Sequence, residues 1–409
     1  MSKLEQLISE LCPNGVDYVH LWEVTVWDKR FNSVDRKKQK QIITYPYLLA
    51  SNLFNLEQRT GNVFLLSTGE KTGWTNKKLA GNYLCQGEVV AIPWGKSRPL
   101  KEVIKYYKGK FVTADNRIAT SNDTDRLLNK YLYYCMINQG ETIDKFYRGS
   151  GIKHPNMNDV LNVTIPLPPL PVQEEIVRIL DKFTELTAEL TAELTAELTA
   201  RKQQYEYYRD NLFVFSDTVL YKPLQEIADI GTGSSNTNEE LEIGEYPFFV
   251  RSQEVRRKDS YEFDEIAIIT SGDGVGVGKI FHYIEGKYAL HQRAYRIHIN
   301  TDDVIPKYYF YYMKSAFLSY IEKNSFHSSV TSIRRPMLNN FPVPIPYPED
   351  KEKSLAEQQR IVDILDRFDK LCNDISEGLP AEIEARQKQY EYYRDKLLTF
   401  KKKEVAENE

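Results

Sequence analysis

The chain contains 409 residues, with 54 Lys and Arg against 58 Asp and Glu, so its formal net charge is −4. Hydrophobic residues make up 41% and charged residues 27%, a balance that excludes wholesale disorder. No run of about 18 apolar residues is present to form a transmembrane helix. The length of the chain predicts two to four domains. The four cysteines form no CxxC pair, so we expect free thiols in a reducing cytosol.

The first globular segment, residues 1–155, is the basic part of the chain. It contains 23 basic and 15 acidic residues, while each later segment is acidic. Residues 88–92 form an apolar run that predicts a buried strand. Residues 131–136 predict a short helix whose aromatic side chains belong to the core. A basic run of Lys37, Lys38 and Lys40 either faces phosphates or is simply solvated.

A long helix is predicted from residue 173 to about residue 213. Apolar residues from Ile176 to Leu186 follow helical spacing, and Pro171 stands just ahead, where a helix tolerates it. The tetrapeptide Thr-Ala-Glu-Leu occurs three times in tandem, over residues 187–198, and its residues favour helix. Each copy would advance the helix by about 6 Å and rotate it by about 40° beyond a full turn. The tract either sets a length or is a neutral expansion.

The second globular segment, residues 213–350, repeats the first in outline. Residues 265–269 predict a buried strand, and residues 308–313 predict a helix with core aromatics. A glycine-rich stretch, residues 272–279, follows the strand and fails both phosphate-loop patterns, so it predicts a hairpin loop that can approach a partner closely. A second long helix is expected from residue 358 to about residue 400, and Gly378 and Pro380 are the positions where it could be interrupted.

An internal repeat organises the whole sequence. Ile-Val-x-Ile-Leu-Asp-x-Phe occurs at 176–183 and 361–368, and Tyr-Glu-Tyr-Tyr-Arg-Asp occurs at 205–210 and 390–395, both at an offset of 185. The globular segments match more weakly, at an offset of 177. Further upstream, the Tyr-Pro pair at 45–46 matches that at 246–247 at an offset of 201, which implies an insertion within residues 55–87 of the first copy.

The predicted fold is α+β. Two globular domains, 1–155 and 213–350, alternate with two helical spacers, 156–212 and 351–409. Because neither helix can bury its apolar stripe alone, we expect the two to form an antiparallel intramolecular coiled coil with approximate two-fold symmetry. The alternative is two separate helices, each docked on its own domain.

No catalytic constellation is evident. Glu349-Asp350-Lys351 has the spacing of some nuclease metal sites but lies in a charged linker without the preceding acidic strand position. The six histidines lack zinc-site spacing, and a Pro-Pro-Tyr/Phe methyltransferase signature is missing. We therefore predict no metal, no cofactor and no catalytic residue in this chain.

At the two repeated helical motifs, the sequence resembles the specificity subunits (HsdS) of type I restriction-modification systems. The Pro-rich exit 165–171 and the opening Leu-Cys-Pro-Asn-Gly-Val-Asp-Tyr, residues 11–18, strengthen the resemblance, and the tandem Thr-Ala-Glu-Leu tract resembles the IC subclass. The resemblance covers the whole chain and is specific in the helical segments. It implies two target-recognition domains, each reading half of a bipartite, asymmetric DNA site, with the helices setting the separation.

The resemblance also implies partners. Two methyltransferase (HsdM) subunits would use S-adenosylmethionine, and two restriction (HsdR) subunits would add an ATP- and Mg-dependent translocase and endonuclease. The chain itself would be a non-catalytic cytoplasmic subunit that binds double-stranded DNA weakly alone. A stand-alone DNA-cleaving enzyme with a coiled-coil hinge and a purely structural dimerising scaffold are the competing interpretations.

Candidate contact residues come from loops expected to be equivalent in the two copies. Base readout favours Arg, Lys, Asn, Gln, Ser and Thr, while phosphates favour Lys, Arg and backbone amides. For each, a solvated surface side chain is the competing interpretation. The DNA-contact candidates are Ser51, Asn52, Lys96, Ser97, Arg98, Asn116, Arg117, Arg148, Ser150, Lys153, Arg251, Ser252, Gln253, Ser271, Gly272, Gln292, Arg293, Ser328, Ser329, Arg334 and Arg335. The residues that either pack the helices or bind the methyltransferase are Tyr205, Tyr207, Tyr208, Tyr390, Tyr392 and Tyr393.

Overall fold

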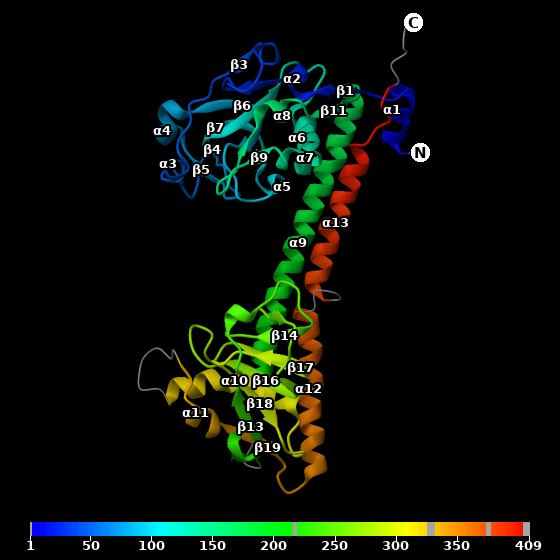
Figure 1. Ribbon diagram of the computed structural model, residues 1–409. Coiled ribbons are helices and arrows are strands. Elements are labelled where there is room, and N and C mark those ends of the chain that lie inside the picture. Colours follow the sequence, from blue (N-terminus) through cyan, green and yellow to red (C-terminus); the bar gives the residue numbers. More distant parts are fainter. Residues whose placement is uncertain (1, 216–218, 325–331, 374–377, 404–409) are drawn as a thin grey trace. The chain divides into compact units, whose positions relative to one another are not determined.

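A computed structural model describes residues 2–215, 219–324, 332–373 and 378–403 (Figure 1). The chain divides into two compact units. Unit 1 comprises Met1–Leu190 and Ala385–Glu409, and unit 2 comprises Thr191–Glu384. Each unit therefore combines a globular part with helical segments, whereas the sequence suggested four consecutive segments. No helix in the described ranges is long and apolar enough to cross a membrane.

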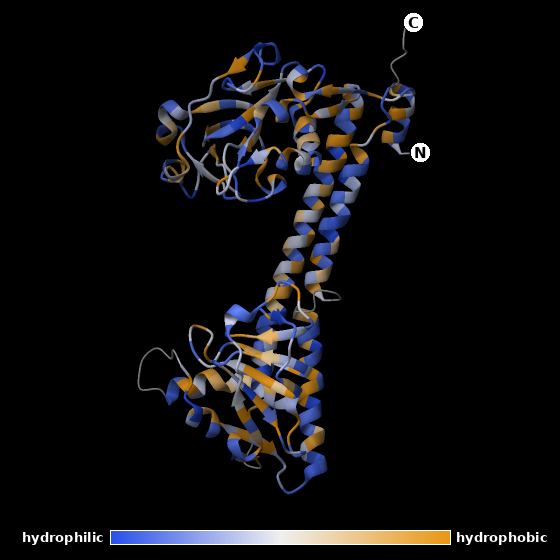
Figure 2. Ribbon diagram, in the orientation of Figure 1, coloured by the Kyte–Doolittle hydropathy of each residue, from blue (hydrophilic) through white to orange (hydrophobic). Residues whose placement is uncertain are grey.

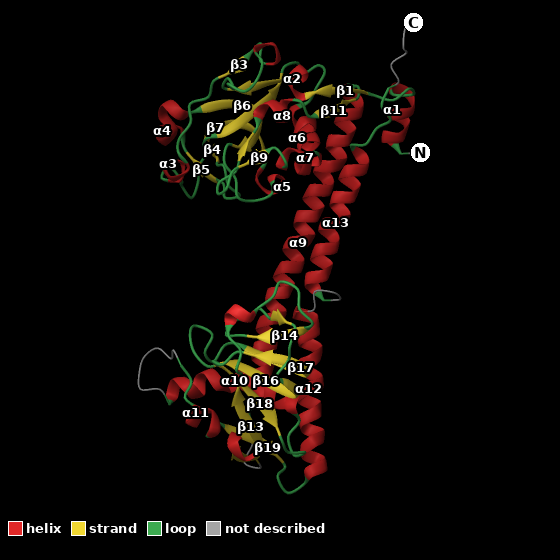
Figure 3. Ribbon diagram, in the orientation of Figure 1, coloured by secondary structure: helices red, strands yellow, loops and turns green. Residues whose placement is uncertain are grey.

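Unit 1 is built on a seven-stranded mixed sheet in the order β3-β2-β8-β6-β7-β4-β5 (Figure 3). Two small antiparallel pairs, β1–β11 and β9–β10, accompany it. The strands of unit 1 are β1 (Asp17–His20), β2 (Thr25–Asp28), β3 (Ile42–Ile43), β4 (Val63–Leu66), β5 (Gly73–Thr75), β6 (Cys85–Pro93), β7 (Lys105–Thr113), β8 (Asn116–Ser121), β9 (Tyr147–Arg148), β10 (His154–Pro155) and β11 (Thr164–Leu167).

Helix α6 of unit 1 contacts β6, β7 and β8 and supplies the buried aromatics Tyr131 and Tyr134. The predicted core role of this aromatic segment is confirmed. The helices that begin in unit 1 are α1 (Lys3–Leu11), α2 (Leu21–Val24), α3 (Ala50–Phe54), α4 (Lys77–Ala80), α5 (Leu100–Val103), α6 (Asn129–Asn138), α7 (Gly140–Asp144), α8 (Met157–Leu161) and α9 (Leu170–Leu212).

Unit 2 is built on a six-stranded sheet in the order β13-β18-β16-β17-β14-β15. Figure 2 shows hydrophobic colouring along its central strands, which carry the buried residues Ala267, Ile268 and Ile269. The strands are β12 (Val219–Pro223), β13 (Ala228–Thr232), β14 (Tyr246–Phe249), β15 (Arg256–Lys258), β16 (Phe263–Ser271), β17 (Phe281–Leu290), β18 (Ala294–Ile299) and β19 (Pro342–Pro346). The helices are α10 (Pro306–Lys323), α11 (Arg335–Asn339), α12 (Lys351–Asn373) and α13 (Leu379–Leu397), the last of which continues into unit 1.

The two sheets are equivalent strand by strand, except that β3 has no counterpart in unit 2. β4 pairs in parallel with β7 and β14 with β17, Leu65 with Val112 and Phe248 with Ala289. The Tyr-Pro pair at 246–247 therefore corresponds to the start of β4, and the match of that pair with Tyr45-Pro46 is wrong.

The insertion of the first copy lies mainly earlier than predicted. Val26 pairs with Thr120 as Asp229 pairs with His298, whereas Leu48 donates to the Thr113 carbonyl as Ser235 donates to that of Leu290. The offset between the copies thus falls from 203 to 187 between β2 and Leu48. Most of the extra chain consequently lies between these points and carries β3 and the basic run, not within 55–87 alone.

Long helices run antiparallel within each unit. In unit 1, Phe183 of α9 meets Tyr393 of α13, and Thr184 hydrogen-bonds Tyr390. In unit 2, Tyr208 of α9 meets Phe368 of α12. These are the same repeat positions with their roles exchanged, so the predicted α+β fold, internal repeat and antiparallel helix pairing are confirmed within the units.

The second long helix is interrupted at Gly378, one of the two positions named for an interruption, but it starts earlier than expected. Among the described residues, α12 ends at Asn373 and α13 begins at Leu379, with Gly378 outside both, and α12 starts seven residues before Gln358. Pro380 occupies the second position of α13, where its missing N–H and fixed φ are tolerated. Pro171 likewise lies inside the first turn of α9 and not just ahead of it.

Candidate nucleic-acid interface

The loop that follows the central strand is anchored in the same way in both units. In unit 1 the loop after β6 forms an antiparallel bridge between Lys96 and Lys153. In unit 2 the loop after β16 forms the equivalent bridge between Asp273 and Ser332. Each bridge joins the loop to the segment before the Pro-rich exit strand. The two segments that we expected to supply contacts are therefore brought together in each unit.

An ion pair joins this loop to the loop after β4 or β14, with reversed polarity in the two units. In unit 1 the carboxylate of Glu70 lies 2.5 Å from the guanidinium of Arg98. In unit 2 the guanidinium of Arg251 lies 2.6 Å from Asp273. Because the cation comes from the later loop in unit 1 and from the earlier loop in unit 2, equivalent scaffolds present donors at different places.

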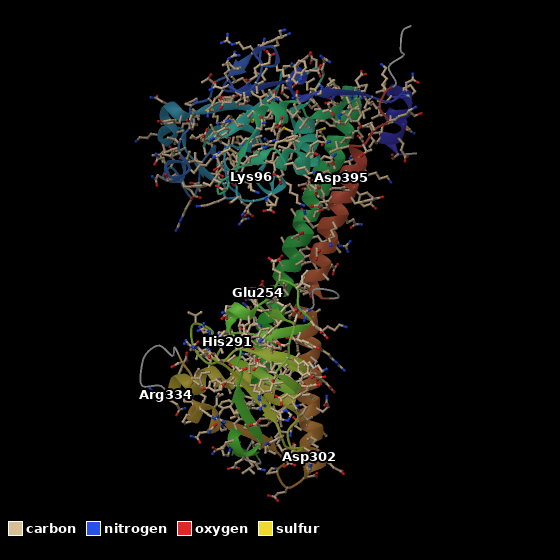
Figure 4. All side chains as sticks on the ribbon, in the orientation of Figure 1. Lys96, Glu254, His291, Asp302, Arg334 and Asp395 are labelled. Carbon is tan, nitrogen blue, oxygen red and sulfur yellow. The ribbon has the colours of Figure 1, made fainter. Side chains whose placement is uncertain are left out.

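Asp273 is the centre of a cationic cluster in unit 2. Arg293 approaches its second oxygen at 3.2 Å, opposite Arg251. Burial works to raise the pKa of Asp273, but hydrogen bonds from the two arginines outweigh it and hold that pKa below its usual range. His291, which Figure 4 labels, accepts a hydrogen bond from the Arg293 backbone N–H at Nδ1, and burial together with the two arginines lowers its pKa. The imidazole is therefore neutral near pH 7.

A related cluster lies in unit 1 around Asp115. Lys29 Nζ and Arg117 Nη1 both lie 2.8 Å from the Asp115 carboxylate, and Arg117 stacks over the Trp94 ring at 3.9 Å. Burial opposes ionisation of Asp115, but the hydrogen bonds from Lys29 and Arg117 lower its pKa overall. Arg117 is thus a largely buried brace between strand and loop, held by an acid and an aromatic ring.

Most DNA-contact candidates are at the surface. Arg98, Arg148, Lys153, Arg293 and Arg334 are exposed, and Figure 4 labels Lys96 and Arg334. Arg335 also donates to the Ile230 carbonyl. The other exposed or half-exposed candidates are Ser51, Asn52, Ser97, Ser150, Arg251, Ser252, Gln253 and Gln292. Whether any of them contacts DNA stays a prediction.

Five candidates lack the open position that a DNA contact through the side chain requires, and the first is Arg117, the largely buried brace described above. Asn116 is buried, and its amide donates to Leu66, Ser67 and Thr113. Ser271 is buried and donates to the Asp273 carbonyl, and Gly272 beside it is buried as well. The Lys96 side chain is only 8% exposed and pairs with Asp144. These residues shape the loops from within. Ser328 and Ser329 lie outside the described residues.

Some residues of this surface were missed by sequence reasoning. Ser51 and Asn52 belong to α3 and are not equivalent to Arg251–Gln253, whose true counterparts begin at Thr68. Glu70 and Lys29 were therefore overlooked, since only the strand register reveals the match. Val275, at the tip of the glycine-rich loop, is 99% exposed. The predicted hairpin itself is confirmed, because β16 and β17 pair antiparallel on either side of it.

The tyrosine motifs divide between core and surface. Tyr205 is buried in unit 2, whereas its repeat partner Tyr390 is half-buried in unit 1. Tyr207 and Tyr392 are 66% and 62% exposed. Tyr208 and Tyr393 are partly exposed; Tyr208 stacks on Phe368, whereas Tyr393 meets Phe183 edge-on. In unit 1 Tyr390 and Tyr393 line a groove of about 230 Å³ with Phe183, Leu186 and Leu190.

Among the described residues, no group of three or more His, Cys, Asp or Glu side chains is arranged to hold a metal ion. The four cysteines are free thiols and buried.

Comparisons with known proteins point to one family. A family model described as the type I restriction modification DNA specificity domain matches residues 29–200 and 217–385. The chain is 32% identical over 440 residues to the EcoR124I/EcoR124II type I restriction enzyme specificity subunit of Escherichia coli, covering 100% of this chain and 99% of that protein. It is 33% identical over 344 residues to a putative type I restriction enzyme specificity subunit of Haemophilus influenzae, covering 78% and 84%.

The fold also matches a solved structure. A chain from a structure that describes complex assembly and conformational transition of a type I restriction-modification system aligns with a TM-score of 0.60 at 15% identity. The alignment covers 95% of this chain and 98% of that one.

Proposed function

The chain belongs to the type I restriction-modification DNA specificity family, and from this membership we propose that each of its units reads one half of a bipartite, asymmetric DNA site. The chain acts as the DNA specificity subunit of a restriction-modification complex. In that complex it binds DNA and the other subunits, and it catalyses no reaction of its own. The observation that carries the proposal is the pair of equivalent, differently charged loop surfaces. Equivalent scaffolds with different side chains would bind different base sequences.

The cations of these surfaces support a role in contacting DNA. Arg98 in unit 1 and Arg251 and Arg293 in unit 2 are exposed and form ion pairs at the surface. Surface ion pairs contribute little free energy, so a guanidinium can exchange its carboxylate partner for a base edge or a phosphate. Arginine offers two parallel N–H donors, which match the acceptors of guanine.

The repeated helical motifs suit a duplicated partner. Tyr207 and Tyr392 occupy equivalent repeat positions and are both exposed. We expect two methyltransferase subunits to dock on these two tyrosine motifs, one at each, and two restriction subunits to complete the assembly. S-adenosylmethionine, ATP and Mg would be bound by those partners, in the cytoplasm. The tandem Thr-Ala-Glu-Leu tract would set the separation of the half-sites, as expected for an IC-like member.

Methylome sequencing tests the proposal. Cells that express this chain with its methyltransferase partner should gain one bipartite adenine-methylation motif that neither protein produces alone. A methylome without any new motif would contradict the proposal. Cleavage of DNA by the purified chain alone would instead favour a stand-alone enzyme.

Deletion of one tetrapeptide, residues 191–194, tests the spacing role. The unread spacer of the motif should shorten while both half-sites keep their bases. A change in the half-site bases would refute the role of the tract in spacing.

A further inference from the structure

A cavity of about 400 Å³ lies in unit 1 beside the start of β2 and the end of β8. Six charged side chains line it: Glu23, Lys37, Lys38, Lys40, Asp123 and Arg126. The lysines of the basic run therefore line a cavity and are not spread over a flat surface. Their side chains converge on one hollow with an arginine from the segment after β8.

Three of the four cations in this cavity have no partner among the described residues. Within the part of the chain that the structure describes, the side chains of Lys37, Lys40 and Arg126 make no hydrogen bond or ion pair, while Lys38 Nζ donates to the Asn162 side chain at 2.7 Å.

The two acids of the cavity are already engaged locally. Glu23 accepts from the His20 backbone N–H at 2.6 Å, and Asp123 accepts from that of Asp125 at 3.0 Å. The hollow therefore carries an excess of positive charge that nothing in the described protein neutralises.

The cations that line the cavity have no counterparts among the described residues of unit 2. The basic run lies in the insertion between β2 and Leu48, which unit 2 lacks. The fourth cation of the cavity, Arg126, corresponds to an acid in unit 2, because Arg126 and Asp303 occupy equivalent positions. The carbonyl of Arg126 accepts from Gln173, and that of Asp303 accepts from Gln358. A general need for surface charge would not produce this difference between equivalent positions.

The cavity is also separate from the loops that we assign to base readout. Those loops follow β6, at the end of the sheet where Pro93 pairs with Asn116. The cavity lies at the other end of β8, where Ser121 pairs with Thr25. The two ends of β8 are five residue steps apart, which corresponds to about 17 Å.

We propose that this cavity binds the phosphate of a phosphate-bearing ligand. Lysine ammonium groups and an arginine guanidinium are the side chains that bind phosphate oxygens, the lysines as point charges and the arginine as a two-pronged donor. The hollow falls within the usual size range of small-ligand pockets. The phosphate belongs either to DNA backbone beyond the bases that unit 1 reads, or to a free phosphate-bearing solute. The first source rests on the proposed function and the second does not.

The test compares two triple variants of the full chain in complex with its methyltransferase. The cavity variant is Lys37→Ala, Lys40→Ala, Arg126→Ala. The control variant is Arg59→Ala, Lys78→Ala, Lys145→Ala, which removes three exposed cations elsewhere on unit 1 that have no partner among the described residues. Both variants lose the same net charge, and none of the six side chains is buried, so both should fold.

Two measurements distinguish the sources. If DNA backbone is bound, the slope of log K against log salt for a site duplex should become shallower by about 2 to 3 in the cavity variant and remain nearer the wild-type value in the control, since each phosphate contact contributes about 0.9. If a solute is bound, calorimetry with inorganic pyrophosphate should show binding to the wild type and the control that weakens about tenfold or more in the cavity variant.

Either result supports the site. Equal behaviour of the cavity and control variants in both measurements would overturn it. Failure of the proposed function is separately visible, because it would remove the bipartite methylation motif from the wild-type complex, whereas loss of the cavity leaves the half-site bases unchanged.

Discussion

The Tyr134 hydroxyl donates a hydrogen bond to the Asp181 carboxylate at 2.5 Å. Lys130 Nζ lies 3.3 Å from the same carboxylate, so one acid on α9 holds two side chains of α6. Burial and this hydrogen bond raise the pKa of Tyr134 well above its usual range, which keeps the hydroxyl a donor at any physiological pH.

The same arrangement recurs in unit 2. Tyr311 donates to Asp366 at 2.6 Å, and Lys307 lies 2.8 Å from it. This acid belongs to α12, at the position equivalent to Asp181. The repeated helical motif therefore attaches each long helix to its own globular part through one aspartate.

Replacement of this aspartate should weaken the attachment. Asp181→Ala removes both partners of α6, and we expect a loss of about 1 kcal/mol in the free energy of unfolding, because the site is partly exposed. Urea denaturation of the full chain measures the loss, and Asp366→Ala should produce a similar value. Asp363→Ala, on the same helix as Asp366, is a control expected to cost less. An unchanged midpoint for both aspartate variants would contradict the inference.

Gln173, in the first turn of α9, makes a more demanding set of contacts. Gln173 is buried, accepts from the Leu128 N–H at 3.0 Å and donates to the Arg126 and Pro168 carbonyls at 2.7 Å each. We expect Gln173→Glu to destabilise unit 1 by about 2–4 kcal/mol, since a carboxylate cannot donate to either carbonyl and leaves a charge buried.

Urea denaturation and hydrogen exchange check this expectation. Protection should fall first in residues 126–128 and 170–180. The exposed neighbour Glu174→Gln is the matched control and should leave stability within about 0.5 kcal/mol of the wild type. Equal stability of the Gln173→Glu variant and the wild type would contradict a structural role for the side-chain amide.

Glu175 predicts a pH dependence of stability. Hydrogen bonding from Arg178 lowers its pKa, against an opposing effect of burial, and Lys3 lowers it further, to about 2. A carboxyl whose pKa is lower in the folded state stabilises the fold above its unfolded pKa and loses that contribution as the pH falls. The stability gap between wild type and Glu175→Gln should therefore be full near pH 7 and should shrink between about pH 4.5 and pH 2.

The measurement is a series of urea denaturations from pH 7 down to pH 3. A gap that stays constant across this range would show that Glu175 contributes through packing and not through its charge. Glu174→Gln, on the exposed side of the same turn, should show no gap at any pH.

The reversed interloop ion pair predicts effects confined to one half-site. Asp273→Asn removes the acid that holds Arg251 and Arg293, so we expect relaxed base selection in the half-site read by unit 2. Glu70→Gln releases Arg98 and should relax the other half-site. Methylation motifs of cells that express each variant with the methyltransferase measure both effects. If either variant relaxes both half-sites equally, the units do not read DNA independently.

Several elements of the fold could be predicted from residues alone. The two apolar runs at 88–92 and 265–269 became the centres of β6 and β16, because buried strands leave a continuous apolar signal. The long helix α9 was predicted within three residues at its start and one at its end. The exact sequence repeats also located the positions where the long helices contact each other in the two units, since these contacts lie in nearly identical segments.

The candidate surface could be predicted less well, for physical reasons. Matching short pairs such as Tyr45-Pro46 and Tyr246-Pro247 misaligned the copies, because register is fixed by strand pairing that leaves no local trace in the sequence. Asn116 is of a residue type that commonly reads bases, but its side-chain amide donates hydrogen bonds to buried backbone carbonyls instead. The interloop ion pairs join residues 22 and 28 positions apart, and only the folded sheet brings them together.

Unit 1 is closed by the two ends of the chain. The Val16 backbone N–H donates to the Lys401 carbonyl at 2.9 Å, and the Lys403 N–H donates to the Val16 carbonyl at 3.0 Å. A ribosome that adds about 5–20 residues per second would thus need roughly 10–40 s to extend the chain from Leu190 to Ala385. During that interval unit 2 can complete itself while unit 1 waits for its last helix. The order of synthesis therefore makes the first unit to be translated the last to be finished, and a chain that terminates early would lack the segment that bonds to Val16.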